Sequence, residues 1–370
     1  MLLLATGSHR LVETRFRGSN GSSIRWITIS KGLGTSFGAS GVIVALAGHL
    51  DGILYQGKRT QIEDLVETSQ AAQGTSLSYE NCSEYKKETN VNCSIKSTSS
   101  SAQKLLLIGD SHAAHFFPLI GLLHQQTGIG ISGFVNAGQP FPPARYTDSG
   151  GRTKERWEQG NSHSQKFFKE QFDLLQSGDM IVLSSRLEYY FLPDKFNLEH
   201  KDLIIRHSDK NWIPIDEDHA FSFWLNEVEK IAKSAEAKGV NVILIAPIPV
   251  FRGYPSERKP KGELCVQEWF RPAIPKECLG LFRQERTSLV SRMKNINKAL
   301  SSLEATYKNI HIYNAFDFLC SQRFQDCETY LNGVRIYRDD DHLSREGSLL
   351  VGSDFLDFTT KLGMIRRQIK

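Results

Sequence analysis

The sequence lacks several features that define common functional classes. It contains no glycine-rich phosphate loop and no dinucleotide-binding fingerprint, so no motif supports nucleotide-dependent chemistry. No segment repeats at the spacing of a solenoid protein. Its mean hydropathy of −0.33 excludes a chain built mostly of membrane helices. Hydrophobic residues make up 40%, too many for a disordered chain, and 370 residues suffice for two domains or one large one.

Most of the chain also lacks an excess of positive charge. The formal net charge is +4. Residues 1–31 account for all of it, because they hold a single acidic side chain, Glu13, against five basic ones: Arg10, Arg15, Arg17, Arg25 and Lys31. The remaining residues are balanced in charge. We therefore predict no nucleic-acid partner, since nucleic-acid binding normally requires a basic surface.

An uncharged segment follows this basic N-terminus. The 19 residues from Gly32 to Leu50 carry no formal charge, and a helix of that length spans roughly 28 Å, close to the thickness of a bilayer core. We predict a transmembrane helix near residues 32–50, with a cytoplasmic N-terminus and an exported C-terminus because of the basic flank. Two alternatives stay open: a signal peptide cleaved after Ala45-Leu46-Ala47, and a buried helix of a soluble protein.

The cysteines also indicate export. There are six, and all of them follow residue 50. Their spacing suggests three disulfides, Cys82–Cys93, Cys265–Cys278 and Cys320–Cys327, although six reduced and buried thiols are the alternative. No pair has the spacing of a zinc site. His112 and His115 have no carboxylate or cysteine at a suitable spacing in the sequence, so we predict no metal.

The rest of the chain alternates between strand and helix patterns. Residues 51–103 are polar, and we interpret them as a linker or small extension. Beyond them, the expected strands are 104–109, 129–135, 180–184, 240–246 and 310–313, and the expected helices are 113–126, 157–175, 221–238, 289–303 and 347–361. Buried strands that alternate with helices predict a parallel sheet covered on both faces, with ligand sites at the carboxyl ends of its strands.

A serine lies where such a sheet presents ligand sites. Gly109-Asp110-Ser111-His112 directly follows the first expected strand. A serine at a strand-to-helix turn is exposed, and its backbone N–H can stabilise an oxyanion. The alternative is a turn in which Asp110 or Ser111 only caps the next helix.

A second motif precedes the last expected helix. In Asp339-Asp340-Asp341-His342-Leu343-Ser344, a histidine could act as general base and an aspartate could fix its tautomer. Taken alone, the segment could equally be a solvated acidic turn. The two motifs together are more specific, because they combine a serine after the first strand with a late Asp and His.

The segment KLLLIGDSHAAHF resembles block I of the SGNH hydrolases, and DDDHLSREG resembles their terminal D-x-x-H block. The resemblance implies a flavodoxin-like three-layer α/β/α fold with Ser111 as nucleophile, His342 as general base and Asp339 as the acid. It implies a positioning role for Asp110 and no catalytic role for Asp340 and Asp341, which we expect to be solvated or structural.

The oxyanion positions match the family less completely. The resemblance assigns the backbone N–H groups of Ser111 and Gly138 as donors, although a plain turn glycine would explain Gly138 as well. The family's Gly-x-Asn after the third strand is missing, and Leu183-Ser184-Ser185-Arg186 occupies its place. Arg186 would replace the missing donor by its charge, or bind a substrate or a structural acid.

A narrower resemblance covers the N-terminal part as well. RLVETRFR, one membrane helix, a linker and a GDSH…DDDHLS domain look like the C-terminal portion of acyltransferase-3 membrane proteins with a fused periplasmic SGNH domain. Glu13 and Arg17 fit their Glu-x-x-x-Arg helix ending. The implied organisation is a membrane remnant at residues 1–50, a periplasmic linker at 51–103 and an SGNH domain at 104–370, in the bacterial inner membrane with the catalytic domain in the periplasm.

These proteins O-acylate, usually O-acetylate, cell-surface polysaccharides such as lipopolysaccharide O-antigen. The resemblance therefore implies a polysaccharide or glycolipid acceptor. It implies no cofactor in this chain, because the membrane bundle, in cis or in trans, handles an acyl donor such as acetyl-CoA. We favour an O-acyltransferase that works through an acyl-enzyme on Ser111. A periplasmic carbohydrate esterase with the same triad and an inactive glycan-binding module remain the alternatives.

Overall fold

The computed structural model describes residues 82–84, 90–98, 103–143, 154–191, 204–206, 212–214, 217–251, 283–331 and 334–365. All of them belong to one compact unit of the chain, residues 64–266 and 273–370. None of the helices in these ranges is long and apolar enough to cross a bilayer. The membrane helix predicted near residues 32–50 and the pair Cys265–Cys278 lie outside the described residues.

A seven-stranded sheet forms the centre of this unit, with the order β1-β2-β4-β3-β5-β8-β10. Its strands are β1 (Cys82–Glu84), β2 (Asn90–Ile95), β3 (Lys104–Gly109), β4 (Gly130–Asn136), β5 (Met180–Ser184), β8 (Asn241–Ile245) and β10 (Ile310–Tyr313). Strands β4, β3, β5, β8 and β10 run parallel to one another. Counted along the chain, their order is 2-1-3-4-5, that of flavodoxin-like sheets. The prediction of a mostly parallel α/β sheet is confirmed.

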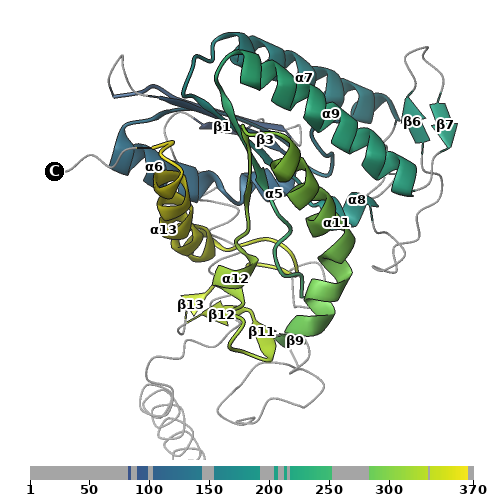
Figure 1. The fold of residues 1–370 in the computed structure, drawn as a ribbon, viewed down its shortest axis with the longest axis vertical. Helices are drawn as coiled ribbons and strands as arrows, with labels where there is room; N and C mark the ends of the chain where they lie inside the picture. The colour runs from purple at the N-terminus through teal and green to yellow at the C-terminus, as the bar shows by residue number, and fades with distance from the viewer. Residues whose placement is uncertain are drawn as a thin grey trace, which may run out of the picture. The chain divides into compact units, whose positions relative to one another are not determined.

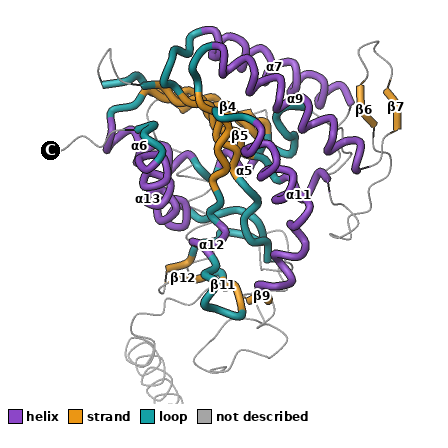
Figure 2. The backbone as a smooth tube through the Cα atoms, viewed as in Figure 1, coloured by secondary structure: helices purple, strands orange, loops and turns teal. Residues whose placement is uncertain are grey.

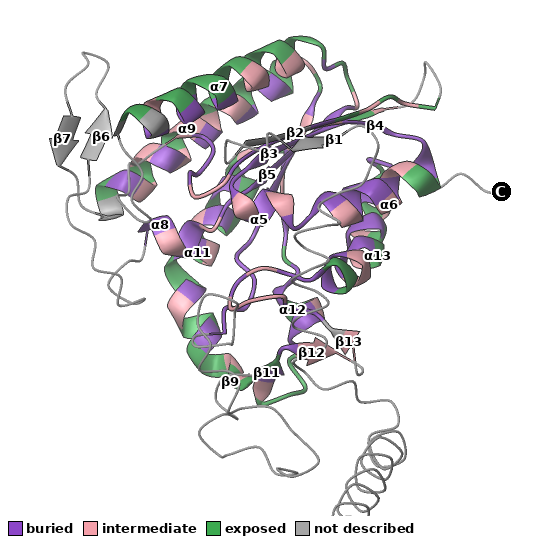
Figure 3. Ribbon diagram, turned by 180° about the vertical axis from the view of Figure 1, so that it is seen from behind, coloured by how far each residue is buried: buried purple, intermediate pink, exposed green. Residues whose placement is uncertain are grey.

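Helices pack against both faces of the sheet (Figures 1 and 2). They are α6 (Phe117–Thr127), α7 (Lys154–Asp173), α9 (Glu217–Ala237), α11 (Arg286–Thr306) and α13 (Arg345–Lys361). Strand β3 shows why both faces are covered: Leu105 and Leu107 pack in the cluster that contains α6 and α13, whereas Leu106 and Ile108 pack in the cluster with α9. Successive side chains of a strand point to opposite faces, so a continuous apolar strand is buried on both sides. Figure 3 shows this burial along β3 and β5.

The sheet begins earlier in the chain than the strand pattern indicated. Strand β2 pairs antiparallel with β4, and β1 pairs antiparallel with β2. Part of the predicted linker 51–103 therefore forms two strands at one side of the main sheet. β2 can be polar there because strands at the side of a sheet need not be apolar throughout. Cys82 lies opposite Cys93 in the β1–β2 register, and Cys93 is disulfide-bonded.

The first helix after β3 is interrupted. Residues 113–126 were expected to form one helix, but the structure has α5 (Ser111–Ala114), then the turn at His115 and Phe116, then α6. The interruption has a local cause in Pro118, at the start of α6, which lacks an N–H and clashes with a helical carbonyl four residues earlier. The short α5 consequently has its own direction, with Ser111 as its first residue.

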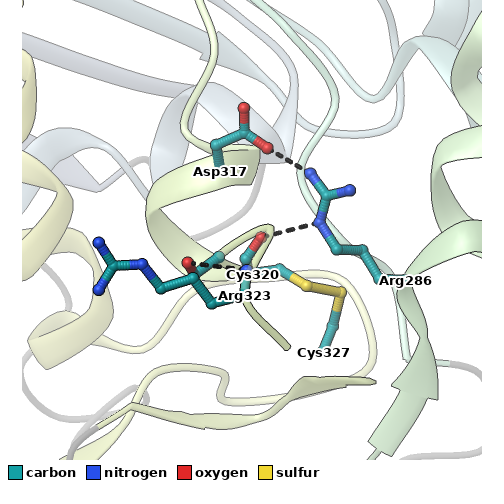
Figure 4. The surroundings of a disulfide bond; sticks show 6 residues. Arg286, Asp317, Cys320, Arg323 and Cys327 are labelled. Carbon is teal, nitrogen blue, oxygen red and sulfur yellow. Dashed lines mark hydrogen bonds and ion pairs between the residues drawn. A yellow bond between two sulfur atoms is a disulfide. The ribbon is translucent and has the colours of Figure 1, made fainter. Parts of the chain in front are cut away.

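The part of the chain after β5 carries small elements beside the sheet. They are α8 (Leu187–Phe191), α12 (Phe316–Leu319), β6 (Ile204–Arg206), β7 (Trp212–Pro214), β9 (Arg283–Glu285), β11 (Asp326–Glu328), β12 (Tyr330–Leu331) and β13 (Val334–Arg335). The predicted disulfide Cys320–Cys327 is confirmed and joins the end of α12 to β11. Figure 4 shows Arg286 beside it, where Nε donates to the carbonyl of Cys320 at 3.2 Å and Nη2 contacts Asp317 at 2.5 Å.

Candidate active site

Ser111 lies at the carboxyl end of the central strand β3. Strand β3 ends at Gly109, and Asp110 caps α5 by accepting a hydrogen bond from the backbone N–H of His112 at 2.7 Å. A side chain at Gly109 does not fit, because its Cβ would lie 1.6 Å from the carbonyl oxygen of Ser184. Glycine therefore lets β3 approach β5 closely just before the chain turns into Ser111. This is the strand-to-helix turn that the sequence predicted.

Asp110 connects this turn to the next strand of the sheet. The side chain is 1% exposed. Its Oδ2 accepts hydrogen bonds from the backbone N–H of Arg186 at 2.9 Å and from the hydroxyl of Tyr190 at 2.7 Å. Burial and the adjacent carboxylate of Asp110 raise the pKa of Tyr190, so this hydroxyl stays protonated and donates. The capping and positioning functions expected of Asp110 are thus carried by different oxygens of one carboxylate.

Asp339 and His342 are in direct contact in the loop before α13. Nδ1 of His342 lies 2.9 Å and 3.0 Å from the two carboxylate oxygens of Asp339. The backbone N–H groups of His342 and Asp341 also donate to Oδ1 of Asp339, at 2.7 Å and 3.1 Å. The three-residue spacing therefore lets two backbone N–H groups of the loop fix the Asp339 carboxylate, and this carboxylate in turn contacts Nδ1 of the imidazole. An acidic turn that was merely solvated would show no such contact.

Burial and charge act in opposite directions on this pair. Burial disfavours the imidazolium of His342, but the carboxylates of Asp341 and Asp339 outweigh it and raise the pKa of His342 to about 10. Burial acts to raise the pKa of Asp339, but the charge of His342, the hydrogen bond to it and the charge of Arg338 together lower that pKa. The two carboxylates thus favour the protonated form of His342.

The C-terminal loop lies against α5. Nε2 of His112 is 3.1 Å from Oδ2 of Asp341, across 229 residues of sequence. The ring centroids of His112 and His342 are 5.2 Å apart, and the backbone N–H of Leu343 donates to Nδ1 of His115 at 3.4 Å. The two motifs that sequence analysis singled out therefore meet, with His342 beside the residue that follows Ser111.

Ser111 and His342 are not hydrogen-bonded to each other. Nε2 of His342 is buried and has no hydrogen-bond partner among the described residues. Catalytic hydrogen bonds are often long or absent before substrate binds, so an open Nε2 is compatible with a general base. The nitrogen opposite the Asp339 contact is thus available to accept a proton.

Of the expected oxyanion groups, Gly138 is in the turn that follows β4. Its φ of 72° is left-handed, which favours glycine. Because Val135 of β4 pairs with Gly109 of β3, this turn lies at the same edge of the sheet as Ser111. That placement fits an oxyanion donor and also fits a plain turn.

The segment that replaces the family's Gly-x-Asn is engaged in internal contacts. The hydroxyl of Ser184 donates to the carbonyl of His112 at 3.1 Å, and the hydroxyl of Ser185 accepts from the backbone N–H of Phe141 at 3.2 Å. Nη1 of Arg186 lies 2.6 Å from Oδ2 of Asp341. Of the functions that the sequence left open for Arg186, binding a structural acid is the one with a contact in the structure.

Sequence reasoning missed two acids of the site. Asp341 was expected to be solvated or structural; it is 4% exposed, and the structure places it between His112, His342 and Arg186. Glu188 is 1% exposed and lies 3.5 Å from Nε of Arg186. No spacing rule could have found the contacts of Asp341 with His112 and Arg186, because they join segments far apart in sequence. The burial of Glu188 is likewise not visible in the sequence.

Two overlapping groups of side chains here could hold a metal ion: the three acids Asp339, Asp340 and Asp341, and a group with two histidines. His112, Asp341 and His342 each offer a ligand atom, and these atoms lie within 4.8 Å of one another. The reasoning that His112 has no acidic partner was therefore wrong, since folding brings Asp341 to it. Hydrogen bonds and ion pairs account for the closeness of the three groups, and the absence of a metal stays a prediction.

The chain was compared with curated protein sequences and with solved structures. No curated protein sequence matches the chain. Among solved structures, the chain is similar to an acylhydrolase of Bacteroides fragilis, with 10% identity, a TM-score of 0.35 and coverage of 72% of this chain and 91% of that one. It is similar in the same way to a GDSL-like lipase of Bacteroides thetaiotaomicron, with 10% identity, a TM-score of 0.35 and coverage of 72% and 93%. These likenesses are too slight to carry an argument.

The comparison with protein families is decisive. Residues 81–357, well over half of the chain, match the family described as the SGNH domain fused to AT3 domains. The match begins just before β1, so it includes the antiparallel edge of the sheet as well as both motifs of the site. An SGNH domain implies an enzyme that transfers or hydrolyses acyl groups. The chain therefore belongs to the family of SGNH domains that are fused to AT3 domains.

Proposed function

We propose that this protein is an O-acyltransferase that transfers an acetyl group to a hydroxyl of a cell-surface polysaccharide, such as lipopolysaccharide O-antigen. The observation that carries the proposal is the contact of Asp339 with Nδ1 of His342, beside the helix that begins at Ser111, in a domain whose family is fused to AT3 domains. Acyltransferase-3 domains are membrane acyltransferases by the resemblance described above, which supports transfer over simple hydrolysis.

The first half of the reaction forms an acyl-enzyme. Ser111 Oγ attacks the carbonyl carbon of the acyl donor, while Nε2 of neutral His342 accepts the hydroxyl proton. Asp339 keeps the proton of His342 on Nδ1, which leaves Nε2 free to act. The backbone N–H groups of Ser111 and Gly138 would stabilise the oxyanion. The imidazolium then returns its proton to the leaving group as the donor bond breaks.

The second half transfers the acyl group to the sugar. His342 accepts a proton from the sugar hydroxyl, whose oxygen attacks the acyl-Ser111 carbonyl. The ester bond to Ser111 breaks, and the proton returns to Oγ, so the enzyme is restored. In the proposed arrangement the membrane portion supplies the acyl group, from a donor such as acetyl-CoA, to a catalytic domain in the periplasm.

The proposal is tested with the full chain, purified in detergent and given p-nitrophenyl acetate together with a polysaccharide acceptor. We expect nitrophenol release and acetylated polysaccharide, measured by mass spectrometry, and we expect Ser111→Ala to abolish both. Ser353→Ala is the matched control, because Ser353 is an exposed serine on α13. It should retain wild-type activity.

The outcomes separate the alternatives. Nitrophenol release that depends on Ser111 but yields no acetylated polysaccharide, with several acceptors, would assign an esterase. Binding of polysaccharide without release above the Ser111→Ala level would assign a glycan-binding module. Either result would overturn the proposed transfer.

A further inference from the structure

Asp341 is the carboxylate that connects the parts of this site. Its Oδ2 contacts Nε2 of His112 at 3.1 Å and Nη1 of Arg186 at 2.6 Å, and its Oδ1 is 3.0 Å from Nδ1 of His342. These partners come from α5, from the segment after β5 and from the loop before α13. The carboxylate is almost completely buried, so these contacts act in a medium in which charge interactions are strong.

The nitrogen of His342 that contacts Asp341 already has a partner. Nδ1 carries a single hydrogen, and Asp339 lies at 2.9 Å with its Oδ1 fixed by two backbone N–H groups. Asp341 is therefore not needed to select the tautomer of His342. Asp341 instead adds a second negative charge beside the imidazole. Negative charge there favours the imidazolium form of His342.

Arg186 opposes that second charge. Its guanidinium lies between two buried acids, Asp341 at 2.6 Å and Glu188 at 3.5 Å. Both carboxylate oxygens of Glu188 are buried without a hydrogen-bond partner among the described residues, and burial raises the pKa of Glu188. An acid in this position needs a nearby cation, so Glu188 and Asp341 together fix where Arg186 lies.

We propose that Arg186 and Asp341 are a positioning pair, anchored by Glu188, that holds His342 against His112 and sets the pH range in which His342 can act as a base. This inference rests on the proposed function for the catalytic importance of His342. The pair joins the loop of the base to the helix of the nucleophile, which the Asp339–His342 contact alone does not do. Two carboxylates beside His342 favour its imidazolium, and the positive charge of Arg186 acts in the opposite direction without cancelling them.

Other charged groups surround His342, and the test has to separate the pair from them. On its own loop these groups are Arg338, Asp339 and Asp340. Two histidines, His112 on α5 and His115 in the turn after it, lie near the ring of His342, and Glu188 lies on α8. The variants below leave all of them in place. A change in the ionisation of His342 then reports the pair.

The ionisation of His342 is measurable without turnover. The C2 hydrogen of an imidazole exchanges with deuterium at a rate that depends on its protonation state, and mass spectrometry follows the exchange peptide by peptide. Trypsin releases residues 339–345, in which His342 is the only histidine. The full chain in detergent is exchanged over a range of pH, and the midpoint for this peptide is the pKa of His342.

Each variant has an expected direction. Asp341→Asn removes a negative charge next to the imidazole and should lower the midpoint by about one to three pH units. Arg186→Gln removes the opposing positive charge and should raise it by about one unit, since Arg186 acts from behind Asp341. The double variant replaces an ion pair by two neutral amides and should return the midpoint close to wild type, a non-additive result expected of coupled groups.

Two further variants control for loss of structure and for charge at a distance. Arg186→Lys keeps the charge but not the fork of the guanidinium, so the midpoint should stay near wild type if the variant folds. Arg323→Gln removes the same charge from an exposed position and should leave the midpoint unchanged. Circular dichroism checks that each variant is folded.

The result that overturns the inference is an unchanged midpoint in folded Arg186→Gln and Asp341→Asn, or shifts of both in the same direction. The pH dependence of p-nitrophenyl acetate hydrolysis distinguishes this failure from failure of the proposed function. If the midpoints move as expected but no Ser111-dependent hydrolysis occurs, the pair is supported and the proposed function fails. If hydrolysis depends on Ser111 but the midpoints do not move, the function stands and the pair is refuted.

Discussion

The tight approach of β3 to β5 makes Gly109→Ala a sharp test of the site. The new Cβ would lie 1.6 Å from the carbonyl oxygen of Ser184. That oxygen is backbone and accepts the hydrogen bond of the Asp110 N–H at 3.3 Å, so it cannot move without separating the strands. Overpacking costs about 1–3 kcal/mol and a lost hydrogen bond about 1 kcal/mol. We expect a loss of about 2–4 kcal/mol, and a melting temperature lower by about 4–16 °C.

The same change should affect chemistry more than stability. Gly109 is two residues before Ser111, and a shift of about 1 Å in a reacting group can cost about 100-fold in rate. Thermal unfolding by circular dichroism and kcat/KM for p-nitrophenyl acetate measure the two effects. Gly352→Ala is the control, because its closest new contact is the side chain of Leu122 at 3.2 Å, which can give way. A Gly109→Ala variant with wild-type melting temperature and activity would refute the described contact.

Three further predictions concern the acid, the base and the disulfide. Asp339→Asn should lower kcat by about 10⁴-fold with KM little changed, because an amide no longer selects the Nδ1–H tautomer of His342; steady-state kinetics measure this, and a loss below tenfold would contradict the assigned acid. His342 has a folded-state pKa of about 10 against 6.5 for the free group, so its contribution to stability is complete below pH 6.5 and is lost as pH rises through 10, with a slope up to about 1.4 kcal/mol per pH unit. Urea unfolding across this range should show the slope in wild type and a smaller one in His342→Gln, and equal slopes would rule it out. Replacing Cys320 and Cys327 together by serine should lower the free energy of unfolding by about 2–3 kcal/mol, from the short loop that the bond closes. Urea unfolding with and without reductant measures this: reductant should destabilise the wild type more than the variant, which keeps the disulfide of Cys93, and equal effects would contradict the prediction.

The sequence predicted most of the parallel sheet because its strands are continuous apolar runs. Segments such as 104–109 and 180–184 are buried on both faces, and such runs are short and bounded by polar residues. Strand β2 was missed for the converse reason. It is a polar strand held by its pairing with β1 and β4, and a pairing partner is not visible in a local pattern.

The site divides in the same way. Ser111, Asp339 and His342 stand in short motifs that resemble those of the SGNH hydrolases, and that resemblance pointed to Asp339, which the structure has in contact with His342. Asp341 was expected to be solvated or structural, and it is structural because folding buries it and brings Arg186 to it. Glu188 was overlooked because its burial is not visible in the sequence. The sequence alone does not show whether an aspartate or glutamate is buried or exposed to solvent.

The distance of 229 residues between His112 and Asp341 also has a consequence for biosynthesis. Synthesis proceeds from the N-terminal side, so Ser111 emerges well before the loop with Asp339 and His342. During that interval the serine has no base, and a nascent or truncated chain cannot form an acyl-enzyme. Under the proposed function, the order of the motifs along the chain thus delays activity until the whole domain has been synthesised and has reached the compartment in which it folds.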